Sequence, residues 1–137
     1  MGKILFGTPP KDIGVVGEMV LDWITQGFWD HIYEGGITKQ DFGQKVHKQL
    51  KKKCESFGSF NGVTLSCEPF FNDKGQTATN SKGTVGVDVL IKYKGTPVVA
   101  LELKTGKGMS KNGFKKRQKW IGTDVVEITI HSARDAK

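Results

Sequence analysis

The sequence of 137 residues lacks the features of several protein classes. Its only two cysteines, Cys54 and Cys67, cannot build a disulfide framework or a zinc site alone, so a reducing compartment is acceptable. No apolar run approaches the roughly 18–20 residues of a membrane span. The start of the chain, Met1 to Pro10, lacks the long apolar stretch of a signal peptide. We therefore expect neither a disulfide-rich secreted fold nor a membrane-spanning chain.

Histidine is also scarce. The three histidines, His31, His47 and His131, are scattered, and no H-N-H or metal-ligand spacing joins them. We expect them to be structural or surface residues.

Glycine and basic residues are abundant. The 18 glycines are about twice the usual share of roughly 7 %, which favours many turns over a plain helical bundle. The length suits a single domain, residues 1–137. The formal net charge of +7 makes a polyanion the first partner to consider.

The positive charge is concentrated in two windows. Residues 39–53 carry a net charge of +5, and residues 104–119 carry +7 without any acid. The rest of the chain must therefore carry −5. A solvated lysine face explains one such window, but two windows favour contact with a phosphate backbone.

Hydrophobic periodicity predicts a mixed α/β (α+β) chain. Residues 1–58 read as a helical N-terminal part, with Thr38 and Asp41 resembling a capping box before the second helix. Residues 60–131 read as the sheet core, with residues 72–84 as a mobile loop. The expected helices are 13–33, 39–57 and 112–121, and the expected strands are 63–71, 85–93, 97–104 and 124–131. This order predicts a mixed central sheet of about four strands flanked by helices, with an extra N-terminal helix.

The sharpest feature is the predicted hairpin between residues 86 and 106. Apolar side chains occupy odd positions in both of its strands, so one face is wholly apolar only if odd positions pair with odd. A three-residue turn over Lys94, Gly95 and Thr96 satisfies this condition. It places Asp88 opposite Glu102, with Lys104 on the same face.

Directly opposed carboxylates need a partner. With Cβ atoms about 5 Å apart they repel by about 3 kcal/mol at an effective dielectric constant near 20. Mg²⁺, or Mn²⁺ in its place, suits two carboxylates, a backbone carbonyl and water, and Lys104 would stand near it. Alternatively, the hairpin is simply amphipathic, and Lys92 and Lys104 neutralise both acids without a metal.

Asp88 and the run Glu102-Leu103-Lys104 resemble the motif of the PD-(D/E)XK superfamily, the restriction-endonuclease-like nucleases. The family's core order of helix, three strands, helix and strand is similar to the order predicted here from the second helix onward. The resemblance implies Mg²⁺ held by Asp88, Glu102 and the carbonyl of Leu103. It also implies that Lys104 acts on the attacking water during phosphodiester hydrolysis.

The resemblance suggests further site residues. Many family members add a Glu from the first core helix; Glu18 in Gly14-Val-Val-Gly17-Glu18 matches that pattern, and Glu55 competes with it. Some members carry a Gln in the helix after the motif, where Gln118 stands, although a structural role suits Gln118 equally. The position before Asp88 is Val87 where the family often has Pro.

Size and charge also resemble the nuclease domains of polymorphic and contact-dependent-inhibition bacterial toxins. That likeness implies action in a bacterial cytoplasm, delivery as the C-terminal domain of a secreted toxin, and an acidic immunity protein as partner. A small phage or repair nuclease, such as a junction resolvase, is an alternative.

Basic residues after the motif are expected to hold a nucleic-acid backbone: Lys107, Lys111, Lys115, Lys116, Arg117 and Lys119. Phosphate contacts carry no base information, so DNA and RNA, tRNA included, stay open as substrates. A non-catalytic nucleic-acid-binding module would use the same basic surface. The two interpretations differ in whether cleavage occurs.

Overall fold

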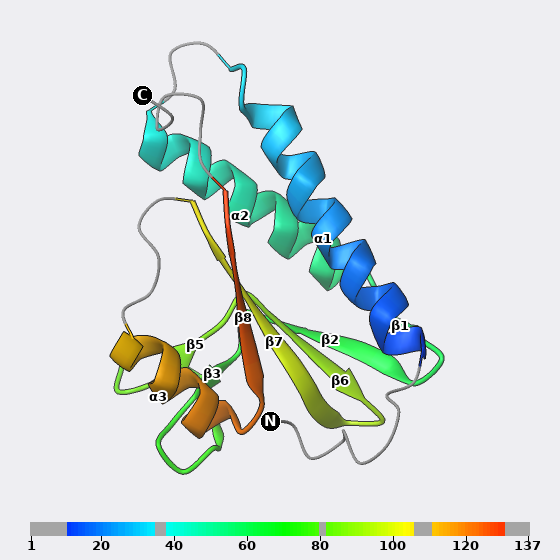
Figure 1. Cartoon of the computed structure of the whole chain (residues 1–137), viewed down its shortest axis with the longest axis vertical. Coiled ribbons are helices and arrows are strands. Elements are labelled where there is room, and N and C mark those ends of the chain that lie inside the picture. The colour runs from blue at the N-terminus through cyan, green and yellow to red at the C-terminus, as the bar shows by residue number, and fades with distance from the viewer. Residues whose placement is uncertain (1–10, 35–37, 80–81, 106–110, 131–137) are drawn as a thin grey trace.

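The computed structural model describes residues 11–34, 38–79, 82–105 and 111–130. Within these ranges the chain forms three helices, a five-stranded mixed sheet and a three-stranded small sheet (Figure 1). The helices are α1 (Lys11–His31), α2 (Lys39–Glu55) and α3 (Lys111–Ile121). The strands are β1 (Ser59–Phe60), β2 (Val63–Cys67), β3 (Phe70–Phe71), β4 (Thr77–Ala78), β5 (Val85–Gly86), β6 (Val89–Tyr93), β7 (Thr96–Lys104) and β8 (Asp124–Thr129). The mixed α/β class predicted from the sequence is confirmed.

The larger sheet has the strand order β1-β2-β6-β7-β8. Strands β1, β2, β6 and β7 pair in antiparallel fashion, whereas β8 returns through α3 to lie parallel to β7. A parallel neighbour requires a crossover connection, and α3 supplies it. Glu102 of the predicted acidic pair lies in the central strand β7, and Asp88 lies directly before the central strand β6.

Helices α1 and α2 pack on one face of this sheet (Figure 1). Helix α2 begins at the predicted capping box, in which the Thr38 side chain accepts from the N–H of Asp41, and the Asp41 carboxylate accepts from the N–H of Thr38. Its apolar stripe is fully buried against the sheet: Phe42, Val46, Leu50 and Cys54. The stripe fixes which side of α2 faces the strands.

A second, smaller core covers the opposite face of the sheet. Leu90 of β6 and Ala100 of β7 pack there with residues of α3, β8 and the small sheet. The small sheet has the order β4-β3-β5. Because this layer extends over the face that carries Glu102, the expected partial cover of the acidic face is present.

The hairpin turn differs from the prediction. Tyr93 pairs with Thr96 across a two-residue turn in which Lys94 and Gly95 have φ angles of +50° and +83°. Positive φ at both positions is the geometry of the tight hairpin turn that matches strand twist, and Gly at the second position favours it. The predicted three-residue turn is therefore wrong.

The predicted odd-with-odd pairing is nevertheless present from Ile91 and Val99 onward, past a bulge. A bulge sets in between Ile91 and Lys92: Lys92 pairs with Pro97 and Ile91 with Val99, so Val98 has no opposite residue. The carbonyl of Val98 accepts a hydrogen bond from the hydroxyl of the buried Thr123. The extra residue predicted in the turn thus lies in the strand, where a partner stabilises it.

Two predicted strands are also shorter than expected. The strand expected over 63–71 ends at Cys67, because Glu68 has a φ angle of +49° and β3 joins the small sheet. The strand expected over 85–93 is divided into β5 and β6, which lie in different sheets. The expected loop 72–84 contains strand β4. Each break turns the chain from one sheet toward the other.

Candidate active site

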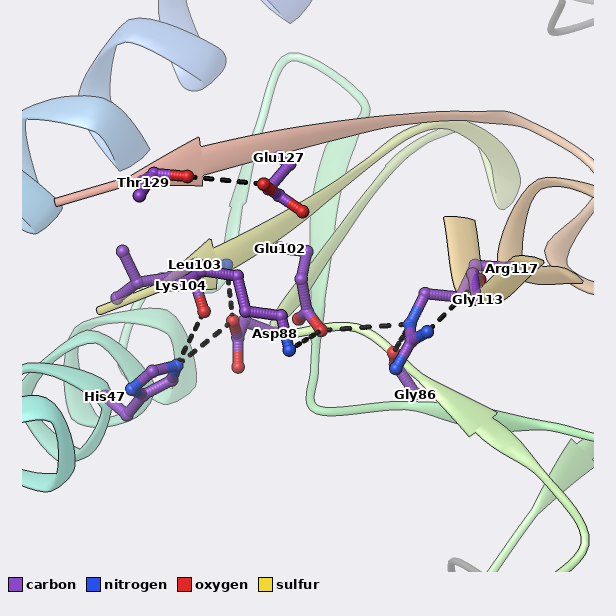
Figure 2. A network of polar contacts seen from close by, with 10 residues as sticks. All are labelled: His47, Gly86, Asp88, Glu102, Leu103, Lys104, Gly113, Arg117, Glu127 and Thr129. Atoms are coloured by element: carbon purple, nitrogen blue, oxygen red, sulfur yellow. Dashed lines mark hydrogen bonds and ion pairs between the residues drawn. The ribbon is translucent and has the colours of Figure 1, made fainter. Parts of the chain in front are cut away.

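Asp88 lies in the short segment between β5 and β6, and Glu102 lies in β7. Val89 pairs with Leu101, so continuing the register by one step places Asp88 opposite Glu102, as predicted. Asp88 Oδ2 accepts a hydrogen bond of 2.6 Å from the backbone N–H of Leu103 (Figure 2). This bond ties the segment before β6 to β7 and holds the two carboxyl groups together.

The two carboxyl groups have opposite pKa shifts. Burial, the charge of Asp88 and a hydrogen bond to Asp88 raise the pKa of Glu102 to about 7. Burial acts against ionisation of Asp88 too, but hydrogen bonds from His47, Glu102 and the N–H of Leu103 hold its pKa below the usual value. Near neutral pH the pair therefore retains a proton on Glu102 in part of the molecules, which is how opposed carboxylates reduce their repulsion.

His47 is a site residue that the sequence did not reveal. Its Nε2 lies 2.8 Å from the carbonyl of Leu103 and 3.5 Å from Asp88 Oδ2 (Figure 2). Its Nδ1 lies 2.9 Å from the carbonyl of Gly43. Carbonyl oxygens only accept hydrogen bonds, so both ring nitrogens must carry protons. The hydrogen bond and charge of Asp88 outweigh burial and raise the pKa of His47 to about 9. The ring is thus an imidazolium beside the acidic pair, and the expected structural or surface role is incomplete.

Two further cations meet the carboxylate of Glu102. Lys104 Nζ lies 3.5 Å and Arg117 Nε lies 3.8 Å from Glu102 Oε2. Arg117 is held by hydrogen bonds from Nε to the carbonyl of Gly86 (2.8 Å) and from Nη1 to the carbonyl of Gly113 (3.2 Å). Arg117 is one of the residues expected to hold a nucleic-acid backbone, and it reaches the acidic pair from α3.

The acidic pair opens into a cleft of about 310 Å³. Asp88, Glu102 and Arg117 line it together with Glu68 and residues of β3 and β5. A cleft of this kind, with three carboxyl groups and one guanidinium on its wall, can hold a polar group or a cation beside the pair.

The additional acids do not join this cleft. Glu18 is exposed on α1 and lines a different, apolar groove of about 420 Å³ with Leu101 and Ile128. Glu55 is exposed at the end of α2, and it is not among the residues that line the cleft. Gln118 is half-buried on α3, yet its neighbour Arg117 is the residue that lines the cleft.

Glu127 stands closer to the pair than either of those acids. It is the partner of Glu102 in the parallel ladder between β7 and β8, and it accepts a 3.3 Å hydrogen bond from the hydroxyl of Thr129 (Figure 2). No motif in the sequence singles it out.

Helix α3 carries the expected basic residues on its exposed surface. Lys111, Lys115, Lys116 and Lys119 are all exposed, and Lys116 Nζ lies 4.5 Å from the centre of the Trp120 ring. Lys107 lies outside the described residues. Arg117 is the only one of these basic residues of α3 that lines the cleft in the described part of the chain.

The donor atoms of the pair suit a hard divalent cation such as Mg²⁺. All are oxygens, and the carboxyl groups of Asp88 and Glu102 are close enough to hydrogen-bond. Within the described part of the chain, no cluster of three or more His, Cys, Asp or Glu side chains could hold a metal ion. A metal would therefore rely on these two acids, water and the carbonyl of Leu103, which here accepts from His47.

The sequence contains signals for the contact of Arg117 with Glu102, which was not predicted, and for His47, which was overlooked. Arg117 lies three residues after Phe114 and four before Ile121, on the buried stripe of α3. His47 directly follows Val46 of the α2 stripe and so lies at its edge. A charged residue on such a stripe indicates a buried polar contact.

Among the described residues, no helix is both long and apolar enough to span a membrane. Comparison with protein-family models, with curated proteins and with solved structures found no significant match to this chain.

Proposed function

We propose that the protein is a metal-dependent nuclease that hydrolyses phosphodiester bonds of DNA or RNA. The observation that carries the proposal is the opposed pair of the half-buried Asp88 and the buried Glu102, with Lys104 beside it and a basic helix following it. A purely structural role does not require two like charges at a cleft, where they raise the pKa of Glu102 to about 7.

The order of elements supports the same proposal. From α2 onward the main elements are α2, β2, β6, β7, α3 and β8, with the acids at the start of β6 and in β7. This order is similar to that of the restriction-endonuclease-like core that the motif suggests. We therefore propose that core as the fold, with β1, the small sheet and α1 as additions.

In this proposal Asp88, Glu102 and the carbonyl of Leu103 hold Mg²⁺ or Mn²⁺. A divalent cation bound there supplies neutralisation of the phosphate and acidification of a coordinated water. Lys104 orients the attacking water from its place beside Glu102. Arg117, fixed by the carbonyls of Gly86 and Gly113, faces the phosphate from the cleft wall and stabilises its developing charge.

One observation favours a second candidate, a non-catalytic nucleic-acid-binding module. His47, Lys104 and Arg117 already offset the charge of the acidic pair without any metal. In such a module the pair would only shape the basic surface. Binding would then occur without cleavage in any metal, and Asp88→Asn would leave affinity unchanged or improve it.

The biological setting is part of the proposal. A small basic nuclease domain suits a bacterial toxin effector that acts in the cytoplasm of a target cell. An acidic immunity protein would then complement the basic face of α3. A phage or repair nuclease is the alternative setting.

The direct test is a cleavage assay on plasmid DNA, tRNA and ribosomal RNA. We expect cleavage with Mg²⁺ or Mn²⁺ and none with EDTA. Glu102→Gln should lower the rate by roughly 100-fold or more, because it removes one of two carboxylate ligands. Glu18→Gln and Glu55→Gln are matched controls outside the cleft and should keep wild-type activity.

A circular dichroism spectrum and an unfolding curve must show that Glu102→Gln still folds. Above pH 7 this variant should be at least as stable as the wild type, because it lacks the carboxylate that repels Asp88. Undiminished cleavage by the folded variant would remove the proposed centre. Loss of activity in Glu18→Gln instead would move the centre to α1.

A further inference from the structure

The two cysteines meet between α2 and the sheet. Cys54 belongs to the last turn of α2 and is 2 % exposed, whereas Cys67 ends β2, is partly exposed and packs against the same core. Both are free thiols, and their side chains are in hydrogen-bonding contact. The chain therefore brings together two sulfurs from elements that are adjacent in space.

Neighbouring charges hold the same two elements together. Lys51, three residues before Cys54, forms a 3.0 Å ion pair with Glu68, the residue after Cys67. The ammonium of Lys51 also interacts electrostatically with Cys67. Lys51 thus stands beside the more exposed of the two thiols.

The two thiols differ in reactivity. Burial and the contact with Cys67 raise the pKa of Cys54, so this thiol is the less reactive of the two until its proton is lost in the second step. Cys67 is more exposed and has the cation of Lys51 beside it. An oxidant therefore reaches and reacts with Cys67 first.

We propose that Cys54 and Cys67 are an oxidation site that forms an intramolecular disulfide when the protein meets a hydroperoxide. In the first step Cys67 sulfur attacks hydrogen peroxide, the O–O bond breaks, and Cys67 sulfenic acid and water form. In the second step Cys54 sulfur attacks Cys67 sulfur, the S–O bond breaks, and the proton of Cys54 leaves with the hydroxyl as water. Each sulfur loses one electron, and the peroxide is reduced to two water molecules.

The bond would join the helix that carries His47 to the strand that precedes Glu68. The N–H of Glu68 donates a 2.9 Å hydrogen bond to the carbonyl of Asp88. Oxidation would thus link α2 and β2, the two elements on either side of Asp88, by a covalent bond. The proposal does not depend on nuclease activity, because it rests on the thiol contact alone.

The test treats the native protein with hydrogen peroxide, unfolds it in an excess of N-ethylmaleimide, and measures its intact mass. We expect the wild type to lose the mass of two hydrogen atoms and to take up no maleimide. Its midpoint of thermal unfolding should rise by about 10 °C, because a cross-link restricts the unfolded chain. Dithiothreitol should reverse both changes.

Two variants separate the steps. Cys54→Ala should stop at the Cys67 sulfenic acid, which dimedone traps, and Cys67→Ala should leave Cys54 reduced. Lys51→Gln should slow disulfide formation several-fold. The proposal is overturned if the peroxide-treated wild type takes up two maleimides, or if it forms only intermolecular dimers.

Discussion

The ring of His47 lies between acceptors on both sides, which ties the charge of this residue to the folded state. Its two nitrogens meet the carbonyls of Gly43 and Leu103, and Asp88 lies beside Nε2. In the unfolded chain none of these partners is in place. The protonated ring is therefore bound more tightly in the folded protein than in the unfolded one.

A pH dependence of stability follows. Because the pKa of His47 is raised from 6.5 to about 9, its contribution is complete below pH 6.5 and is lost as the pH rises through 9. Allowing for its partial exposure, we expect the free energy of unfolding to fall by about 1–2 kcal/mol over this window. Urea unfolding with EDTA present, below pH 6.5 and above pH 9, measures the difference. His47→Gln should lack it.

Nuclear magnetic resonance of the ring gives a second measurement. The titration midpoint of His47 should lie near 9 in the wild type and move toward 6.5 in Asp88→Asn, which removes the nearby charge. A wild-type midpoint near 6.5 would contradict the doubly bonded ring. Glu102 makes a separate contribution in a lower pH window. Its pKa is raised from 4.5 to about 7, so it favours the folded state only while it is protonated, and this contribution is lost as the pH rises through 7.

At the residue scale, the sequence was informative where the alternation of apolar and polar residues along a strand determines which side chains face each other. Apolar residues at odd positions were enough to oppose Asp88 and Glu102. His47 could not be placed in the same way, because its partner Leu103 is 56 residues away in the chain. Arg117 was recognised as basic, but its contact with Glu102 depends on how α3 packs.

At the scale of elements, the position of α2 depends on a close approach to the residue that follows β7. A Cβ atom on Gly43 would lie 2.3 Å from Thr105 Oγ1, well inside contact distance. The carbonyl of Gly43 also accepts from His47. The missing side chain at this position therefore lets the helix lie close enough for His47 to reach Leu103.

Gly43→Ala should push α2 away from Thr105. We expect it to lower the free energy of unfolding by about 1–3 kcal/mol, the usual cost of overpacking. The double variant with Thr105→Ala removes Oγ1 and leaves only a 3.4 Å contact with Cβ, so it should recover most of the loss. Denaturant unfolding of the two single variants and the double variant measures the coupling. An additive double variant would contradict the contact.

The helices and long strands were predictable, whereas the short strands were not. Helix α2 was predictable at its first residue because Thr38 and Asp41 form a local cap. Strands β3 and β5 have two residues each, and they exist because they pair with one another across a sequence gap. No periodic pattern can appear in so few residues.

At the scale of the whole molecule, the basic residues of α3 lie next to an acidic centre. Arg117 of this helix lines the cleft, and the exposed lysines of α3 are available to a polyanion that binds across the helix. Each lysine that contacts a phosphate releases a counterion from the nucleic acid. Binding should therefore depend strongly on salt.

Replacing Lys111, Lys115 and Lys119 together by Gln, in a Glu102→Gln background that prevents cleavage, should weaken binding to duplex DNA. The slope of log affinity against log salt should become shallower by up to about 0.9 for each phosphate that the variant no longer neutralises. Fluorescence anisotropy over a salt series measures it. A control with the same decrease in charge replaces Lys11, Lys92 and Lys94 and should keep the wild-type slope. Equal slopes in both triple variants would contradict a role for α3.

The unpaired Val98 has a consequence for how the hairpin can vary. An odd number of residues separates Asp88 from Glu102, so one of these residues has no partner when the two acids are opposed. That residue can lie in the turn or in β7, and the acids stay opposed in either case. Deleting Val98 would leave an even number of residues that pair fully across a two-residue turn, and a single insertion in β6 opposite Val98 would do the same. The tip of the hairpin is therefore free to lengthen or shorten by matched pairs of residues. A designer could extend it as a handle while the two carboxyl groups stay opposed.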